Sequence, residues 1–561
     1  MRIRPNVGWF LAYTAAFAVL AGFVFWGTWS LDAAPVMPDC PTTHNPKWIA
    51  AWFAEWLRTG KWAPDDLRIF LASPYFWQEL QYAFGLWCSG LGLAYFCRGR
   101  GFSLPACYGG GLLLAFCGYW TTLFSAGHLG WFEWMTYGVF AFGLADRAVR
   151  KGKLKNWLLL GACLSWASLN QPDIWLFFTL FTAAYFIWRT AFVAAGTPPD
   201  GRRAFWRRWL VGSLAALASM LATGAAGFRS AYVNDFAGRS EQLERGDTLS
   251  KASKADEKNA RWIFVTNWSM PPEDTLEFVR ERANGDTSCP LSLALAAQQK
   301  KDLKPYTGRL GRPIDAPSGN YRQHSLYVGP VTCLLAIVGV ILALAGRFRR
   351  TSGAEAARSR SLALDAAFFF AAAVLFYLFS LGRFCEPLYR HTVYAVPFLD
   401  SMRAPVKWHH LTELCVAFLA ACGIEAMLRT GFAKARKSVL WCVMAIVLAG
   451  AVDLARADSR FCVPVTVKSA RRLGLHADIT YIQRQQFSSP QVAAMVKHGY
   501  IVPLAAGGDI VISEVLKRHD PVKFPPVDPV VLTLGILSVV ASLGVLAFAA
   551  ASALKHGAKK R

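Results

Sequence analysis

Apolar stretches of about 20 residues recur along this chain and constrain its fold more than any other feature, because a helix needs roughly that length to cross a bilayer. The twelve candidate stretches are 8–27, 76–97, 103–123, 130–145, 154–170, 173–193, 206–228, 326–346, 364–381, 409–428, 438–455 and 530–553. We therefore expect an all-α polytopic membrane protein with about 12 transmembrane helices.

The amino-acid composition agrees with a membrane protein and excludes two other classes of protein. Of the 561 residues, 54% are hydrophobic and 17% are charged, whereas a soluble chain carries about 25% charged residues. A soluble multidomain enzyme is thus excluded, and the high apolar fraction excludes a disordered chain. The sequence also contains no GxxxxGK[ST] phosphate-binding loop, so ATP-driven chemistry is not expected.

Basic residues predict the orientation of the chain in the membrane. There are 60 Lys and Arg against 36 Asp and Glu, a net charge of +24. Short cationic segments mark both chain ends and follow every even-numbered stretch: Arg2/Arg4, Arg98/Arg100, 147–155, 202–208, 347–360, 434–437 and 555–561. This positive-inside pattern predicts an inner (cell) membrane protein with both termini in the cytoplasm, and it requires no nucleic-acid partner.

The connections on the opposite side are longer and are expected to be extracytoplasmic. The predicted organisation is an N-terminal module (1–228) with outer loop 28–75, an outer loop (229–325), spans eight to eleven (326–455) with outer loop 382–408, an outer segment (456–529), and a last span with a basic tail (530–561). Trp48, Trp52 and Trp56 share one face of a predicted interfacial helix. Strand-like runs at 461–467, 500–504 and 509–515 predict a small α/β outer segment.

Ionisable residues in or beside the spans are candidates for function, because charge at bilayer depth is costly. Glu79, Glu133, Asp173, Glu413 and Asp453 fall toward the expected outer face. Cations precede the tenth span at Arg383, Arg390, His391, Arg403, Lys407, His409 and His410. Such a group suits a lipid-linked phosphate donor, since cations neutralise a leaving phosphate and a carboxylate deprotonates an acceptor hydroxyl. Alternatively, these ions pair with one another, or they bind anionic lipid headgroups.

Three segments of the chain resemble the YfhO-like membrane proteins, a branch of the GT-C glycosyltransferase superfamily. They are the opening loop with Asp39 and Gly60–Pro64, the segment Trp268–Leu276, and Leu381–Tyr389 with its continuation Met402–Pro405. The resemblance also covers the arrangement of the expected transmembrane spans along the whole chain. It implies a GT-C-like fold and transfer of a sugar from a polyprenyl-phosphate carrier to a glycan, lipid or protein acceptor on the non-cytoplasmic face.

The resemblance also implies roles for individual residues. Asp39 matches the acidic position of the first outer loop best, with Asp32 second, so Asp39 is the expected general base. Arg383, Arg403 and Lys407 are expected to hold the phosphate of the lipid-linked donor. Trp268 is expected to shape the acceptor side, and the cavity lining is expected to comprise His128, Glu133, Asp173, His409 and His410. The opening loop contains no Asp-x-Asp pair, which leaves a divalent metal cofactor open.

Two other functions fit the same pattern of spans. Twelve spans with both termini inside is also a common arrangement for a secondary transporter or lipid flippase. Such proteins usually contain matching halves, whereas here the outer loops of the two halves differ in length. A non-catalytic assembly protein on the same scaffold is the remaining alternative, since fold does not fix function.

Overall fold

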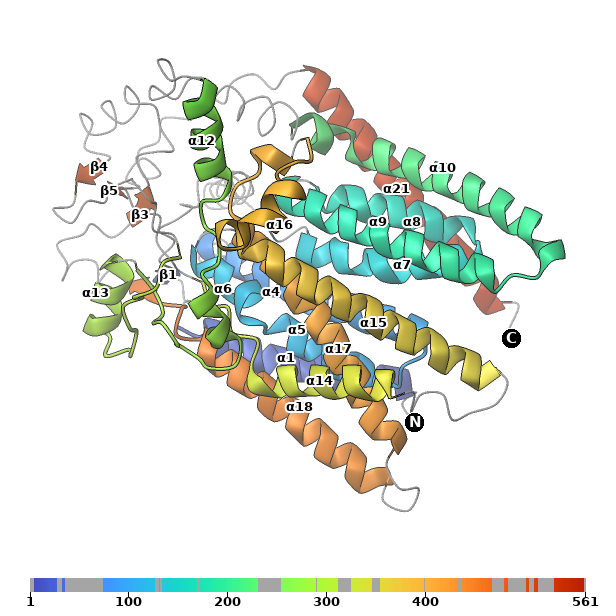
Figure 1. Cartoon of the computed structure of the whole chain (residues 1–561), viewed down its shortest axis with the longest axis horizontal. Coiled ribbons are helices and arrows are strands. Elements are labelled where there is room, and N and C mark those ends of the chain that lie inside the picture. The colour runs from blue at the N-terminus through green and yellow to red at the C-terminus, as the bar shows by residue number, and fades with distance from the viewer. Residues whose placement is uncertain are drawn as a thin grey trace, which may run out of the picture.

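The structure is a computed structural model of the whole chain (Figure 1). It describes residues 5–27, 33–35, 74–126, 131, 134–168, 172–230, 254–288, 290–310, 324–345, 354–397, 399–430, 436–466, 479–482, 501–503, 509–512 and 529–558. Most of these residues are helical. The helices of the bundle are α1 (Pro5–Phe25), α4 (Pro74–Arg100), α5 (Leu104–Ala115), α6 (Gly118–Ala126), η2 (Trp134–Gly138, a π-helix), α7 (Val139–Lys151), α8 (Leu154–Trp166), α9 (Pro172–Ala195), α10 (Pro199–Ser230), α14 (Pro330–Leu344), α15 (Ala354–Ser380), α17 (His409–Thr430), α18 (Arg436–Asp458) and α21 (Pro529–Ala558).

Seven of the described helices are long and apolar enough to cross a membrane, which agrees with an all-α membrane protein. They comprise α1, α9, α10, α15, α17, α18 and α21. The other expected spans coincide with α4, with the pair α5 and α6, with η2 and α7, with α8, and with α14. The expected span 103–123 is broken at Phe116–Cys117, where α5 ends and α6 begins.

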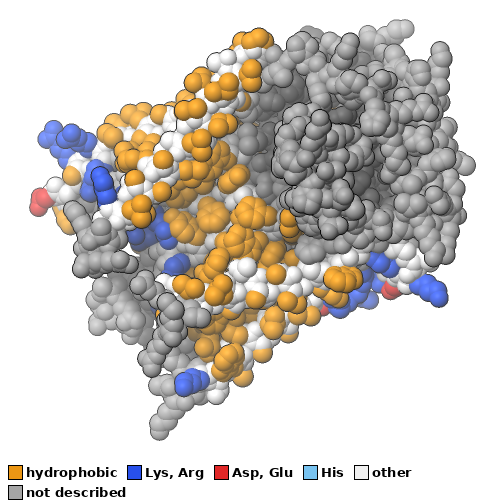
Figure 2. All heavy atoms as spheres, turned by 180° about the vertical axis from the view of Figure 1, so that it is seen from behind, with side chains coloured by type: hydrophobic (Ala, Val, Ile, Leu, Met, Phe, Trp, Pro, Cys, Tyr) orange, Lys and Arg blue, Asp and Glu red, His pale blue; other side chains and the backbone are white. Residues whose placement is uncertain are grey.

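The surface of the bundle explains why these helices need a membrane. Figure 2 shows apolar side chains covering one face, with Lys and Arg gathered toward both of its ends. Large apolar side chains are widely exposed on the described helices, among them Val19 at 72% and Trp441 at 73%. Apolar area on this scale marks an interaction surface, and a lipid bilayer lets it stay exposed without contact with water. The cations at the two ends fit the polar headgroup layers.

The helix α17 forms the centre of the bundle. Its most apolar stretch is 83% buried, compared with 6% for α21 at the periphery. It packs on α14, α15 and α5. Close approach to α14 depends on glycine, because a Cβ at Gly423 would lie 2.0 Å from the carbonyl oxygen of Leu335. Small residues at such crossings let helix backbones pack closely within a membrane.

The shorter elements gather at the end of the bundle opposite the marked chain ends (Figure 1). They include α12 (Lys254–Val265), η4 (Pro272–Phe278), α13 (Pro290–Gln298), η6 (Gly382–Cys385), α16 (Glu386–His391), η7 (Leu399–Ser401) and η8 (Pro405–Trp408). Strand β1 (Ala33–Pro35) pairs antiparallel with β2 (Pro464–Thr466). A second sheet has the order β3–β5–β4, formed by Ile479–Ile482, Asp509–Ile512 and Ile501–Pro503. The predicted interfacial helix around Trp52 lies outside the described residues.

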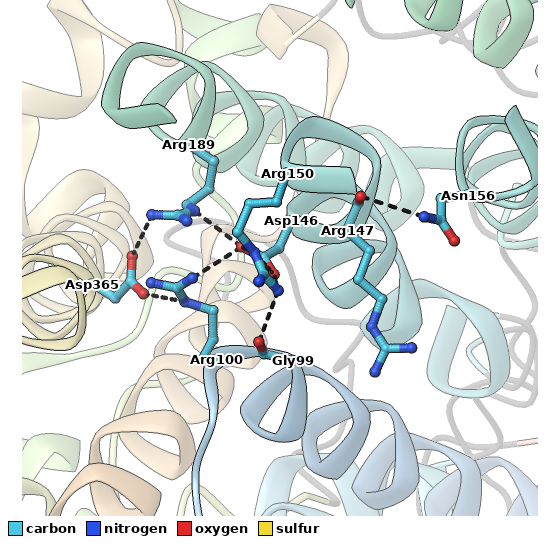
Figure 3. A network of polar contacts seen from close by, with 8 residues as sticks. All are labelled: Gly99, Arg100, Asp146, Arg147, Arg150, Asn156, Arg189 and Asp365. Atoms are coloured by element: carbon cyan, nitrogen blue, oxygen red, sulfur yellow. Dashed lines mark hydrogen bonds and ion pairs between the residues drawn. The ribbon is translucent and has the colours of Figure 1, made fainter. Parts of the chain in front are cut away.

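A buried ionic network joins four helices, α4, α7, α9 and α15 (Figure 3). Arg100 of α4 contacts Asp365 of α15 at 2.5 Å and Asp146 of α7 at 3.1 Å. Arg189 of α9 contacts the same two carboxylates, at 3.1 Å for Asp146 and 3.8 Å for Asp365. Arg150 also pairs with Asp146, where the helix α7 approaches its end. Arg100 was expected in a cytoplasmic cationic segment, whereas the structure buries it, with 6% exposed.

Candidate functional site

Two of the segments that carry the family resemblance meet at the end of the bundle that holds α12 and α16. The Met270 N–H donates to the Ser380 carbonyl at 2.8 Å, and the Val406 N–H donates to the Trp268 carbonyl at 3.1 Å. The Arg383 N–H donates to Ser269 Oγ at 3.0 Å. We call these contacting segments, 266–270, 380–383 and 403–408, the outer junction, because they are expected on the extracytoplasmic side. It brings together residues more than 100 positions apart in the sequence.

The backbone of the outer junction is strained. Trp268 and Ala404 have positive φ angles of 61° and 69°, a conformation that side chains disfavour. Gly382 has φ +48°, and a Cβ there would lie 2.1 Å from Ser269 Oγ and 2.6 Å from Pro405 Cγ. Strain of this kind persists only where surrounding contacts hold it, and it concentrates at functional sites.

The three cations that are expected to bind phosphate differ from one another in their surroundings. The guanidinium of Arg383 is half-buried and donates from Nε and Nη2 to the Thr266 carbonyl, at 3.1 and 2.9 Å. Burial lowers the pKa of Arg383. Arg403 is exposed, and its guanidinium carbon lies 5.9 Å from the ring of Phe264. Arg403 is therefore accessible to a ligand, whereas Arg383 is partly committed to the backbone of the junction.

Lys407, the third cation, forms an ion pair with Asp173, which lies at the start of α9. The Asp173 side chain is fully buried and that of Lys407 is 14% exposed. Asp173 Oδ1 also accepts the N–H of Ile174 at 2.9 Å. Trp408 stacks on Phe177 of the same helix, with ring centroids 3.9 Å apart. These contacts fix the outer junction against α9.

Behind the outer junction, Tyr119 lies among three histidine rings. Its ring centroid lies 4.8 Å from His324, 5.7 Å from His409 and 4.1 Å from His410. The ring of His410 also lies 4.0 Å from that of Trp131. His409 and His410 are 0% and 1% exposed. Histidine rings packed on aromatic faces are held in fixed positions, and a protonated ring gains cation–π attraction there.

A buried carboxylate completes this histidine group. Glu413 Oε1 lies 3.5 Å from Nε2 of His409, one helical turn away on α17. The same oxygen accepts the Tyr119 N–H at 3.1 Å, at the beginning of α6. The Glu413 side chain is 0% exposed. An imidazole beside a carboxylate is a pair that can accept and return a proton.

Six of the eleven expected site residues therefore lie at or beside the outer junction, namely Trp268, Asp173, Arg383, Lys407, His409 and His410. Arg403 belongs to the same segment but points to the surface. Asp32, Asp39, His128 and Glu133 lie outside the described residues. Their roles stay predictions.

Sequence reasoning missed Tyr119 and His324. Tyr119 lies inside the expected span 103–123 and His324 directly precedes the span 326–346, and neither belongs to a recognisable motif. Only the packing brings the ring of Tyr119 to those of His324 and His410. Glu413 was recognised as an outer carboxylate but was not assigned to the site. Its position one turn after His409 on a helix is the signal that identifies the pair.

Within the described ranges, no group of three or more His, Cys, Asp and Glu side chains is arranged to hold a metal ion. Cys385 and Cys462, two of the cysteines outside the spans, are free thiols. Comparison with known protein families, curated proteins and solved structures gives no match. The arrangement of the site is therefore the basis for a functional proposal.

Proposed function

We propose that this chain is a multi-pass membrane glycosyltransferase of GT-C type. It would transfer a sugar from a polyprenyl-phosphate donor to a glycan, lipid or protein acceptor on the extracytoplasmic face. The observation that carries the proposal is the outer junction, where the segments Trp268–Leu276 and Leu381–Tyr389 contact each other. These are two of the three segments in which the chain resembles the YfhO-like proteins.

The proposed topology has twelve spans with both termini in the cytoplasm. It is supported by the ends of the chain, since the start of α1 and the end of α21 lie at the same end of the bundle (Figure 1). It is also supported by α4, α5 to α8 and α14, which occupy the positions of the remaining expected spans. The outer junction then lies on the extracytoplasmic side, where a lipid-linked sugar would meet its acceptor.

In the proposed reaction, Asp39 accepts the proton of the acceptor hydroxyl, with Asp32 as the alternative base. The acceptor oxygen bonds to C1 of the sugar while the bond between C1 and the phosphate oxygen breaks. Polyprenyl phosphate leaves with that electron pair. Nearby cations stabilise the charge that develops on the departing phosphate.

The cations of the outer junction differ in how well they are placed to stabilise the departing phosphate. Arg403 is exposed, so its guanidinium is free to form a two-pronged contact with a phosphate. Lys407 carries three N–H donors, and its ammonium pairs with Asp173 at the start of α9. Arg383 fixes the backbone around Thr266 and adds positive charge nearby. His409 and His410, which are buried behind these cations, would support the junction from the interior of the bundle.

A secondary transporter or lipid flippase is a second candidate, favoured by one observation. The network of Arg100, Asp146, Arg189 and Asp365 is buried inside the bundle, and intramembrane ion pairs often mark ion or substrate pathways. A transporter would move its substrate intact, whereas a transferase would break the sugar–phosphate bond.

The proposed base is tested with purified protein in liposomes that contain a radiolabelled polyprenyl-phosphate hexose. Asp39→Asn should abolish release of the sugar from its carrier, while Asp302→Asn, at an exposed carboxylate paired with Arg282, should not. Unchanged release by the Asp39→Asn protein would show that Asp39 is not the base. Asp32→Asn then tests the alternative.

A further inference from the structure

A groove with a volume of about 730 Å³ opens beside the outer end of α1. One wall is the exposed face of α1 with the turn that follows it, where Val19, Phe23 and Trp26 are 72%, 55% and 79% exposed. The other wall combines residues 301–303 with the end of α18. The groove does not involve the residues of the outer junction.

Apolar and polar groups are separated along the groove. The apolar wall belongs to α1, a helix long and apolar enough to cross the membrane. The polar end holds Lys301, Arg460 and Asp302, and the Asp302 carboxylate is paired with Arg282 at 2.6 Å. Trp26 marks the level of the interface, where Trp side chains gather in membrane proteins. The groove therefore matches the two parts of a membrane lipid: its apolar wall suits the acyl chain, and its polar end suits the charged headgroup.

The two cations at the polar end differ in their partners. Arg460 forms an ion pair with Glu281, which also binds Arg456 at 2.6 Å. Lys301 instead donates to the Cys462 carbonyl at 3.1 Å, and no ion pair joins it to a carboxylate of the described residues. Burial lowers the pKa of the Lys301 ammonium, because the charged form is disfavoured where no anion compensates it.

The partly buried Lys301 ammonium is thus paired with no carboxylate in the part of the chain that the structure describes. Only one of its three N–H donors is used by the Cys462 carbonyl. A phosphate supplied from the bilayer would provide both the missing charge and further acceptors. Its acyl chain would then cover apolar area on α1 that is otherwise exposed.

We propose that this groove binds an anionic glycerophospholipid, with its phosphate at Lys301 and an acyl chain along Val19 and Phe23. This site goes beyond the proposed sugar transfer, because it lies apart from the outer junction. The bound lipid would join α1 to the 301–303 segment and to the end of α18. It would thus stabilise the extracytoplasmic end of the bundle.

The proposal is tested by native mass spectrometry of the purified full-length protein, titrated with phosphatidylglycerol or with zwitterionic phosphatidylcholine. The protein should bind phosphatidylglycerol more tightly than phosphatidylcholine. Lys301→Met should weaken phosphatidylglycerol binding about tenfold, the effect of losing one charge-assisted hydrogen bond. Lys304→Met is the matched control, because Lys304 is exposed and outside the groove.

Ala18→Phe tests the apolar wall independently, since it narrows the groove without changing charge. It should weaken binding of both lipids, and size-exclusion chromatography verifies that each variant is folded. Equal binding of the two lipids, no binding, or unchanged binding by both Lys301→Met and Ala18→Phe would overturn the proposal. Displacement of the lipid by inorganic phosphate would also overturn it, as it would indicate a phosphate site without a lipid groove.

Discussion

Nε of Arg100 lies 2.5 Å from Oδ2 of Asp365, although the two residues are 265 positions apart. Their side chains are 5% and 0% exposed, so the ion pair lies in the interior of the bundle. Asp146 and Arg189 extend it to two more helices (Figure 3). We expect this buried network to contribute more to the choice of helix partners than to net stability.

Removing one partner of this network should be costly. Asp365→Asn leaves Arg100 and Arg189 buried with one carboxylate fewer, and we expect a loss of about 3–5 kcal/mol in the free energy of unfolding. Thermal unfolding in detergent, followed by tryptophan fluorescence, measures this change. Arg207→Met, at an exposed position of α10, is the control and should stay within about 0.5 kcal/mol. A similar effect of both substitutions would contradict the structural role of the network.

Gly382→Ala should disrupt the outer junction. The new Cβ would lie 2.1 Å from Ser269 Oγ, and its φ of +48° disfavours any side chain. We expect a loss of about 1–3 kcal/mol in stability, measured by the same thermal unfolding. Gly535→Ala is the matched control, since nothing lies within 4 Å of a Cβ there. If Gly382→Ala were as stable as Gly535→Ala, the close contact with Ser269 would be wrong.

Lys407 should matter for catalysis as well as for folding. Lys407→Met removes the ion-pair partner of the buried Asp173 carboxylate, and we expect a loss of about 3 kcal/mol in stability. The double variant Lys407→Met/Asp173→Asn should recover much of that stability, because the buried charge is gone as well. If Lys407 holds the donor phosphate, sugar transfer by the double variant should stay reduced about 100-fold. Recovery of both stability and transfer would assign Lys407 a structural role alone.

The contact between Glu273 and Arg309 should make stability depend on pH. The hydrogen bond from Arg309 lowers the pKa of Glu273 below its ordinary value of 4.5. The folded carboxyl therefore releases its proton more readily than the unfolded one, so the contribution is complete above pH 4.5 and is lost as pH falls through the lowered pKa.

Because both side chains are more than a third exposed, this contribution should be less than about 1 kcal/mol. Thermal midpoints of the unmodified protein and Arg309→Met are compared at pH 7 and at the lowest pH at which both stay folded. The difference between the two proteins should shrink at the lower pH. A constant difference would show that Glu273 does not titrate with folding.

The helices could be predicted from the sequence because their signal is local. The stretch 173–193 corresponds to α9, Pro172–Ala195, and 438–455 lies within α18, Arg436–Asp458. Apolar length alone defines such segments. The same signal merged α5 and α6 into one span, because the break at Phe116–Cys117 is itself apolar.

Contacts between distant segments could not be predicted in this way. The cationic character of Arg100 indicated a cytoplasmic loop, and nothing in the neighbouring residues indicated its pairing with Asp365. In the site, the cations of 383–410 were recognised from their density. The aromatic surroundings of His410 were not, because Tyr119 and Trp131 come from other parts of the chain. Periodicity identifies an element and its faces, whereas partners depend on how the elements pack.

The most direct test of the central proposal is whether the protein cleaves a lipid-linked sugar. Purified protein is reconstituted in liposomes with a panel of radiolabelled polyprenyl-phosphate hexoses and membrane extract as the source of acceptor. Carrier-free polyprenyl phosphate and labelled product are then separated and counted. The proposal predicts release from at least one donor, reduced about 100-fold in Arg403→Met or in Lys407→Met/Asp173→Asn. If every donor stays intact, or is only moved across the bilayer unchanged, the protein is not a glycosyltransferase.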